Sequence, residues 1–186
     1  MGEKMNIFYL NPNPKICAQW HNNSHCSKMI IEYAQLMSTA HRVLDGEMYH
    51  GRTKNGRKIK RWKLNSKLEH ILYKASHINH PSGIWVRQSK GNYFWLYELW
   101  KELNKEFMYR YDHDKSHESF RKLEEALYRP PMNIPDGVWT EPTPAMPDDV
   151  KNKCSLTAYR NYYIEYKQHL AKWGKREEPH WYVRAA

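Results

Sequence analysis

A histidine and a carboxylate stand seven residues apart in the segment 23–45, whose apolar periodicity predicts a helix. Two helical turns then separate His25 from Glu32, which places them within ~20° of each other and ~10 Å apart along the axis. Lys28 and Gln35 fall on the same side. A carboxylate flanked by cations can act as a general base or stabilise a developing cation. The alternative is that these residues form only the solvated face of an amphipathic helix.

The most basic segment of the chain is 51–63, where seven Lys or Arg residues occur with no acidic residue among them. Asn55 and Gly56 at its centre predict a β-hairpin with a type I′ turn, which needs positive φ at both central positions. Uncompensated charge of this kind favours phosphate contact, and a disordered solvated arm is the alternative. The side chains that we expect on DNA phosphates are Arg52, Lys54, Arg57, Lys58, Lys60 and Arg61 in this segment, with Arg42 and Arg87 outside it.

The overall charge of the chain also indicates a polyanionic partner. Thirty Lys and Arg residues against twenty Asp and Glu residues give a net charge of +10 over 186 residues, a length typical of one domain. No apolar run approaches the ~20 residues that span a bilayer, and no signal peptide is evident. Three cysteines without a repeated CxxC spacing are typical of a reducing compartment. We therefore expect a monomeric cytoplasmic protein that binds nucleic acid and has no membrane partner.

Other chemistries find weaker support in the sequence. Cys17, His21, His25 and Cys26 include ligands that zinc accepts, but structural zinc sites usually show two separated ligand pairs around a loop, so no metal is expected. The chain has no nucleophile elbow, no GxGxxG and no Walker loop, so no nucleotide cofactor is expected either. The aromatic residues that lie off the helical stripes are candidates for stacking on bases. They are Trp20, Trp62, Trp85, Tyr93, Trp139 and Trp181.

The elements that must position these residues are mainly helices. Residues 5–10 predict a buried extended segment, and 130–149, with six prolines, predicts a loop packed over the surface, because Ile134, Val138, Trp139 and Met146 are apolar. The C-terminal tail is aromatic and should dock. Helices are expected at 15–21, 23–45, 82–88, 92–111, 116–128 and 155–173, and from a capping box at 66–69 onward to Ala75. The predicted fold is all-α, a compact single domain over 1–186 with a short basic β-hairpin or arm.

Several of these motifs together resemble a known family. They are the run at 5–10, His25 and Glu32 at a spacing of seven, the triplet 79–81 before a long Leu-rich helix that ends at Arg110 and Tyr111, and the aromatic tail 178–182. In this combination the chain resembles the pyrimidine-dimer DNA glycosylases of the phage endonuclease V type and their bacterial relatives. The resemblance extends over residues 5–111 and the tail and rests on short motifs.

The resemblance implies a compact helical enzyme that bends DNA and flips a nucleotide. It also implies that Glu32 is essential for breaking the N-glycosidic bond, and that a nearby histidine and arginines hold phosphate and base. In that family the amino terminus is the nucleophile that forms an imine with the sugar. Here Met1 to Lys4 precede the matching segment and can carry the amine up to ~14 Å away. The lyase step is therefore left open, and Asn6 would be the second residue if Met5 were the natural start.

The sequence as a whole predicts a DNA glycosylase that flips and excises a damaged or modified base of double-stranded DNA without a cofactor. Glu32 and His25 are the expected catalytic residues. The expected base and sugar pocket consists of Asn6, Lys28, Gln35, Asn79 and His80. Two alternatives stay open: a phage enzyme that modifies bases on the same scaffold, and a non-catalytic DNA-binding or host-takeover protein.

Overall fold

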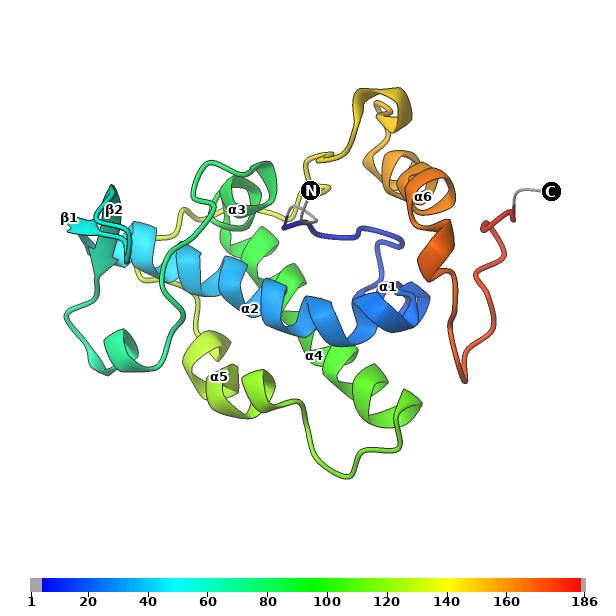
Figure 1. Cartoon of the computed structure of the whole chain (residues 1–186), viewed down its shortest axis with the longest axis horizontal. Coiled ribbons are helices and arrows are strands. Elements are labelled where there is room, and N and C mark those ends of the chain that lie inside the picture. Colours follow the sequence, from blue (N-terminus) through cyan, green and yellow to red (C-terminus); the bar gives the residue numbers. More distant parts are fainter. Residues whose placement is uncertain (1–4, 185–186) are drawn as a thin grey trace.

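A computed structural model describes residues 5–184 of the chain (Figure 1). About half of the chain is helical, so the prediction of a mostly helical fold is confirmed, although a two-stranded antiparallel sheet makes all-α an approximation. Its buried apolar side chains form one contiguous cluster. The helices are α1 (Pro14–Trp20), α2 (Asn23–Asp45), α3 (Pro81–Val86), α4 (Lys90–Arg110), α5 (Glu118–Tyr128) and α6 (Ser155–Tyr166), and the strands are β1 (Glu47–Arg52) and β2 (Lys58–Lys63).

Helix α2 is the central element, and α4 and α5 pack against it (Figure 1). The Asn22 side chain accepts a hydrogen bond from the His25 N–H and so caps the helix, one residue before the caps that the sequence suggested. The predicted apolar stripe of α2 is confirmed: Met29, Ile30 and Tyr33 are at most 1% exposed. Residues 36–42 are buried on every side of the helix, so α2 keeps partly exposed residues only before and after them.

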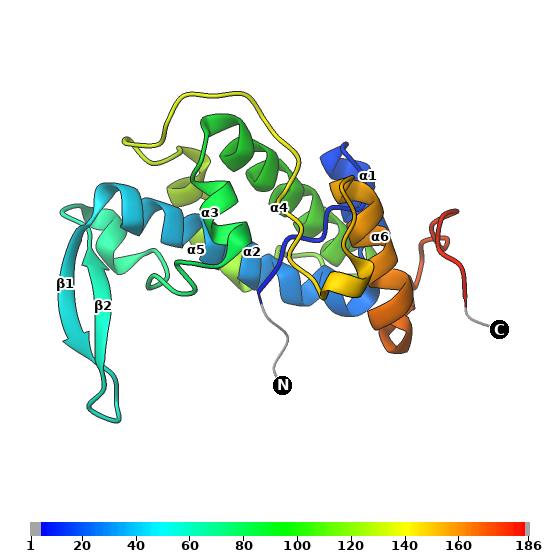
Figure 2. The ribbon, with the colours of Figure 1, turned by 90° about the horizontal axis from the view of Figure 1, so that it is seen from above.

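The segment 5–10 is extended and buried, as predicted, and runs beside α2. The Phe8 N–H donates to the Tyr33 hydroxyl over 3.2 Å, which ties the segment to the helix. At its far end the Leu10 N–H donates to the Cys17 thiol of α1. Both views show that the described chain begins beside α3 and the middle of α2 (Figures 1 and 2).

The helix predicted from 66 to 75 is wrong, because only a 3₁₀ turn, Lys67–His70, forms there. Ser66 caps this turn, but the Glu69 carboxylate accepts from the Leu64 N–H and from Arg42 instead of completing the capping box. Arg42 also donates to the carbonyl oxygens of Glu69, Leu72 and Tyr73. A helix would need such carbonyls as its own acceptors, so the buried guanidinium competes with propagation of the helix.

Strands β1 and β2 form the predicted hairpin, which projects from the end of α2 (Figure 2). The type I′ turn is wrong. The Gly56 N–H donates to the Thr53 carbonyl and the Thr53 N–H donates to the Arg57 carbonyl, which defines a three-residue loop. Gly56 has φ of +76°, and Asn55 is not among the residues with positive φ. The turn is thus a type I turn followed by a left-handed glycine, the arrangement usual for three-residue hairpin loops.

The loop 130–149 lies over the body, as predicted, with Ile134 and Met146 buried. Asn92 of α4 fixes it by accepting from the Thr140 N–H, and the Trp85 indole donates to the Thr140 carbonyl. Val138 is 82% exposed, so its predicted packing role is wrong.

Helix α6 ends at Tyr166 rather than at residue 173, and a 3₁₀ turn, Gln168–Leu170, follows it. The aromatic tail docks as predicted, with Tyr182 buried and Trp181 half-buried. Arg176 fastens the tail to the body through an ion pair of 2.6 Å with the buried carboxylate of Glu106.

Candidate functional site

The polar face of α2 presents a carboxylate to solvent in a fixed place. Glu32 pairs with Lys28 one turn earlier, with 3.5 Å between Nζ and Oε1. The Glu32 side chain is 15% exposed and that of Lys28 is 38% exposed. Gln35 lies half-buried on the same side of the helix. Since Tyr33 holds the segment 5–10 against α2, the backbone beside Glu32 is braced by the core.

Asn6 joins three elements next to this face. Its Nδ2 donates to the Ala145 carbonyl over 2.6 Å, and its Oδ1 accepts from the Tyr159 hydroxyl of α6 over 3.0 Å and from the Ser82 hydroxyl of α3 over 3.5 Å. Asn6 is only 3% exposed. The sequence predicts Asn6 in the base and sugar pocket, but its side chain is buried. It instead connects the start of the described chain to α3, α6 and the loop 130–149.

The loop 76–80 is the second wall of the site. Thr39, seven residues after Glu32 and on the same side of α2, accepts from the Ser76 N–H and donates to the Ser76 carbonyl. The His80 Nδ1 accepts from the Ser82 N–H and caps α3, and Asn79 is exposed beside it. An open hollow of about 590 Å³ is lined by residues 77–81.

His25 does not reach the surface, so its predicted catalytic role is not supported by its position. The ring is fully buried and stacks on Phe8 with 4.0 Å between centroids. Its Nδ1 lies 2.6 Å from the Tyr163 hydroxyl, and burial raises the pKa of Tyr163 well above its ordinary value. Because the Asn22 oxygen is used as the helix cap, its Nδ2 faces the same Nδ1. The Tyr163 hydroxyl and the Asn22 amide thus lie beside the same ring nitrogen.

His21 belongs to the same buried cluster. Its Nδ1 donates to the Cys17 carbonyl over 2.7 Å and its Nε2 lies 2.7 Å from the Tyr33 hydroxyl. Burial lowers the pKa of His21 to about 3, so the ring is neutral. The described residues hold no group of three or more His, Cys, Asp or Glu side chains placed to share a metal ion.

Two arginines that were predicted to contact phosphate make hydrogen bonds inside the fold. Arg42 is 3% exposed, and its five N–H groups donate to four carbonyl oxygens and to the Glu69 carboxylate. Arg87 donates to the Ile78 carbonyl over 2.7 Å and supports the loop that carries His80. Burial lowers the pKa of Arg87. Arg42 is thus buried and occupied, whereas Arg87 is half-buried and supports one wall of the site.

Among the predicted phosphate contacts, the fully exposed side chains are all on the hairpin. Five of the predicted phosphate contacts are exposed and Arg61 is half-buried; the exposed ones are Arg52, Lys54, Arg57, Lys58 and Lys60. Arg52 donates to the Gly56 carbonyl at 2.9 Å and stiffens the turn. The positive charge predicted for this segment is therefore presented on an ordered ribbon.

Two of the six aromatic residues proposed for base stacking are core residues, and three more pack against the core. Trp85 and Tyr93 are at most 1% exposed, and Trp139 is partly buried against the core cluster. Trp20 and Trp181 are also half-buried and flank the Arg160 guanidinium at 5.3 and 5.2 Å. Trp62, on β2, is half-buried and lies on the projecting hairpin.

Sequence reasoning missed the contribution of α6 to this side of the molecule. The Tyr162 ring stacks near Phe8, with 6.1 Å between centroids, and the Lys167 ammonium lies 5.0 Å from the centre of that tyrosine ring. Lys167 is 5% exposed. Its place inside the helix predicted at 155–173 gave no sign that it would be buried.

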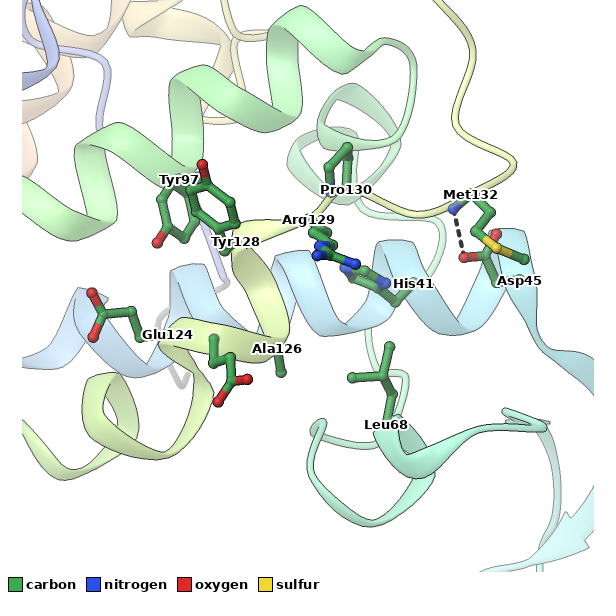
Figure 3. Close-up of a pocket in the computed structure, with 11 residues that line it drawn as sticks. His41, Asp45, Leu68, Tyr97, Glu124, Ala126, Tyr128, Arg129, Pro130 and Met132 are labelled. Carbon is green, nitrogen blue, oxygen red and sulfur yellow. Dashed lines mark hydrogen bonds between the residues drawn. The ribbon is translucent and has the colours of Figure 1, made fainter.

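A larger cavity, about 770 Å³, lies on the other side of α2 (Figure 3). His41, which lines it, follows Glu32 by nine residues and so points ~180° away. Burial lowers the pKa of His41 to about 4. Asp45, Glu124 and Glu125 also line this cavity. Three carboxylates against one arginine give this lining a net negative charge, so the cavity is a poor nucleic-acid site compared with the Glu32 face.

The comparisons with known proteins give no family assignment. No protein-family model, no curated protein and no solved structure matches the chain. Within residues 5–184 no helix is long and apolar enough to cross a membrane. The geometry of the Glu32 face and the hairpin, together with the motifs in the sequence, therefore carries what can be inferred about function.

Proposed function

We propose that the protein is a DNA glycosylase that flips a damaged or modified base out of duplex DNA and excises it. The observation that carries the proposal is the setting of Glu32. This carboxylate is partly exposed, paired with Lys28 at 3.5 Å, and set on the side of α2 to which Thr39 ties the loop before α3. It occupies the sequence position that the glycosylase resemblance marks as essential.

Cleavage of an N-glycosidic bond is assisted by a carboxylate beside the sugar. As the C1′–N bond breaks, its electron pair leaves with the base and positive charge develops on the sugar. A preorganised carboxylate stabilises that charge, or orients the water whose oxygen forms the new bond to C1′ while its proton passes to the departing base. Glu32 is assigned this role, and Lys28, which pairs with it, is assigned to the adjacent phosphate or the base.

A nucleotide flipped out of the duplex also needs a pocket that encloses its base and sugar. The loop 77–81 lines an open hollow, Asn79 is exposed on it, and His80 is fixed by its cap on α3. Gln35 extends the polar face of α2 toward the same loop. These residues are assigned to the base and sugar pocket, while Asn6 and His25 are assigned to holding the surrounding elements in position.

The partner in this proposal is double-stranded DNA. The +10 charge of the chain and the exposed cations of the hairpin supply the sequence-independent attraction to phosphates. The proposed nucleophilic amine of a lyase step falls on residues 1–4, which lie outside the described residues. Base excision is therefore proposed here without a commitment to strand cleavage.

The alternatives give different products from the same substrates. Incubation with a panel of plain, damaged and phage-modified duplexes, followed by quantification of abasic sites and released bases, separates them. A glycosylase gives abasic sites and free base. A base-modification enzyme gives altered bases without abasic sites, and a non-catalytic binder changes none of the duplexes. Either of the last two results would overturn the proposal.

A further inference from the structure

The register of the hairpin sorts its side chains into two chemically different faces. Directly paired residues share a face, and successive pairs alternate between faces. The pairs Met48 with Trp62, His50 with Lys60, and Arg52 with Lys58 therefore lie on one side. We name these six residues the acid-free face.

The opposite face contains the hairpin's one carboxylate. It is formed by the pairs Glu47 with Lys63, Tyr49 with Arg61, and Gly51 with Ile59. Glu47 also accepts a hydrogen bond from the Asn65 amide over 3.1 Å. A Cβ built on Gly51 would lie 3.2 Å from Cγ of Arg61, so the arginine stem lies across the glycine and covers that face. Part of the charge of this face is thus offset, and part of its surface is occupied by packing.

The hairpin is mounted on α2 through buried contacts. Arg42 donates to the Trp62 carbonyl over 3.1 Å and to the Glu69 carboxylate over 2.6 Å, and that carboxylate also accepts from the Leu64 N–H. The same guanidinium is 3% exposed. Because the base of β2 is fixed in this way, the hairpin and the Glu32 face keep a set separation.

That separation can be expressed in base pairs of a duplex that lies along α2. Glu32 and the last residue of α2, Asp45, are thirteen residues apart, which is ~20 Å along the helix axis. At ~3.4 Å per base pair, this corresponds to about six base pairs. The major groove, ~12 Å wide, admits a two-stranded ribbon.

We propose that the acid-free face of the hairpin docks in the major groove of the duplex, about six base pairs to one side of the nucleotide at Glu32. This inference rests on the proposed function for the position of the target nucleotide. Arg52, Lys58 and Lys60 lie against the phosphates that border the groove, and His50 and Trp62 face its floor. The protein then holds DNA asymmetrically, with one anchored flank.

Two charge-matched double variants test the choice of face. K58Q/K60Q removes two cations from the acid-free face, and R61Q/K63Q removes two from the opposite face on the same strand. Binding to a plain mixed-sequence 24-base-pair duplex is measured by fluorescence anisotropy over a range of salt concentrations. K58Q/K60Q should weaken binding at least about tenfold at ~0.1 M salt and flatten the slope of log K against log[salt] by about 1.8. R61Q/K63Q should change affinity less than about threefold.

Equal effects of the two variants would overturn the proposal, because net charge rather than one face would then govern binding. Thermal unfolding of both variants checks that each remains folded. Base release by the wild-type protein is scored separately. Its absence together with a face-specific binding defect would remove the glycosylase assignment and leave the docking face intact, so the two failures are distinguishable.

Dimethyl sulfate probing of guanine N7 tests the predicted offset. The probe is a duplex with one central tetrahydrofuran residue, an abasic-site analogue that cannot be cleaved by base release. Protection should appear about six base pairs to one side of the analogue, and K58Q/K60Q should abolish it while R61Q/K63Q retains it. Symmetric protection, or no protection at that distance, would overturn the offset.

Discussion

The arginines inside the body and the cations of the hairpin show what the same charge does in two environments. Arg42 and Arg110 each make five hydrogen bonds and are at most 6% exposed. Arg110 donates to the Ala18 and Gln19 carbonyls at the end of α1. Lys58 and Lys60, by contrast, are exposed on the hairpin. Buried arginines therefore satisfy main-chain acceptors, and only the exposed cations are available for a polyanion.

The buried arginines and the hairpin cations should differ most in their contribution to the free energy of unfolding. Arg42→Met removes the guanidinium donor from four buried or partly buried carbonyls and from the Glu69 carboxylate. We expect the free energy of unfolding to fall by about 3 kcal/mol, measured by urea denaturation. Arg57→Met, at an exposed hairpin position, should change it by less than about 0.5 kcal/mol. Equal effects of the two changes would erase the distinction between buried and exposed arginines.

The converse experiment removes hairpin charge and measures DNA binding. If the hairpin neutralises about four phosphates, it contributes roughly −3.6 to the slope of log K against log[salt]. Replacing Arg57, Lys58, Lys60 and Arg61 by Ala should flatten that slope by at least the roughly 1.8 that Lys58 and Lys60 contribute, while the urea midpoint changes little. An unchanged slope would place the DNA-binding surface elsewhere on the molecule.

Acid should destabilise the body through its buried histidines. Burial holds the pKa of His21 at about 3, below the value near 6.5 in the unfolded chain. As pH falls through this interval the unfolded state takes up the proton first, so the stability that His21 provides is complete above about pH 6.5 and is lost toward pH 3. Urea titrations at pH 7, 5 and 4 should show this decline.

A matched pair of histidine variants isolates the source of that pH dependence. His21→Gln should make the decline shallower, whereas His50→Gln, on the exposed hairpin strand, should leave it unchanged. A decline of the same steepness in His21→Gln would mean that other groups carry the acid sensitivity.

The smallest predicted effect distinguishes two forms of the hairpin turn. Gly56 has φ of +76°, and a Cβ at this position would meet no atom within 4 Å, so Gly56→Ala is strained only by its backbone conformation. It should cost about 1 kcal/mol. Asn55→Ala should cost less than about 0.5 kcal/mol, because Asn55 is outside the set of positive-φ residues. Similar costs in urea denaturation would favour the type I′ turn instead.

Periodic patterns in the sequence predicted the elements that local interactions determine. The stripe of α2 and the buried run 5–10 follow from apolar spacing, and the hairpin follows from a glycine turn between two polar strands. The helix at 66–75 failed because a distant guanidinium takes its carbonyl acceptors, which no local signal reveals. The catalytic prediction for His25 lacks support for a related reason. Helical spacing places His25 at nearly the same angle around the α2 axis as Glu32, but Phe8 and Tyr163 cover its ring.

The candidate site was predicted in part. Glu32, Lys28 and Gln35 lie together on α2 because a helix of known phase places them there. The loop before α3 reaches the same side through hydrogen bonds between Thr39 and Ser76, which connect residues distant in sequence. Contacts of this range, and the burial of Asn6 and Lys167, depend on the assembled core.

The most direct test of the role proposed for Glu32 compares two glutamates of similar exposure. Glu32 and Glu102 have side chains 15% and 16% exposed, and each pairs with a lysine on its own helix. Base release from the substrate identified in the duplex panel is measured for Glu32→Gln and Glu102→Gln, with DNA affinity and urea stability as controls. We predict that Glu32→Gln loses at least about a hundredfold in base release with affinity within a few-fold, and that Glu102→Gln keeps its activity. Full base release by Glu32→Gln would contradict the catalytic assignment.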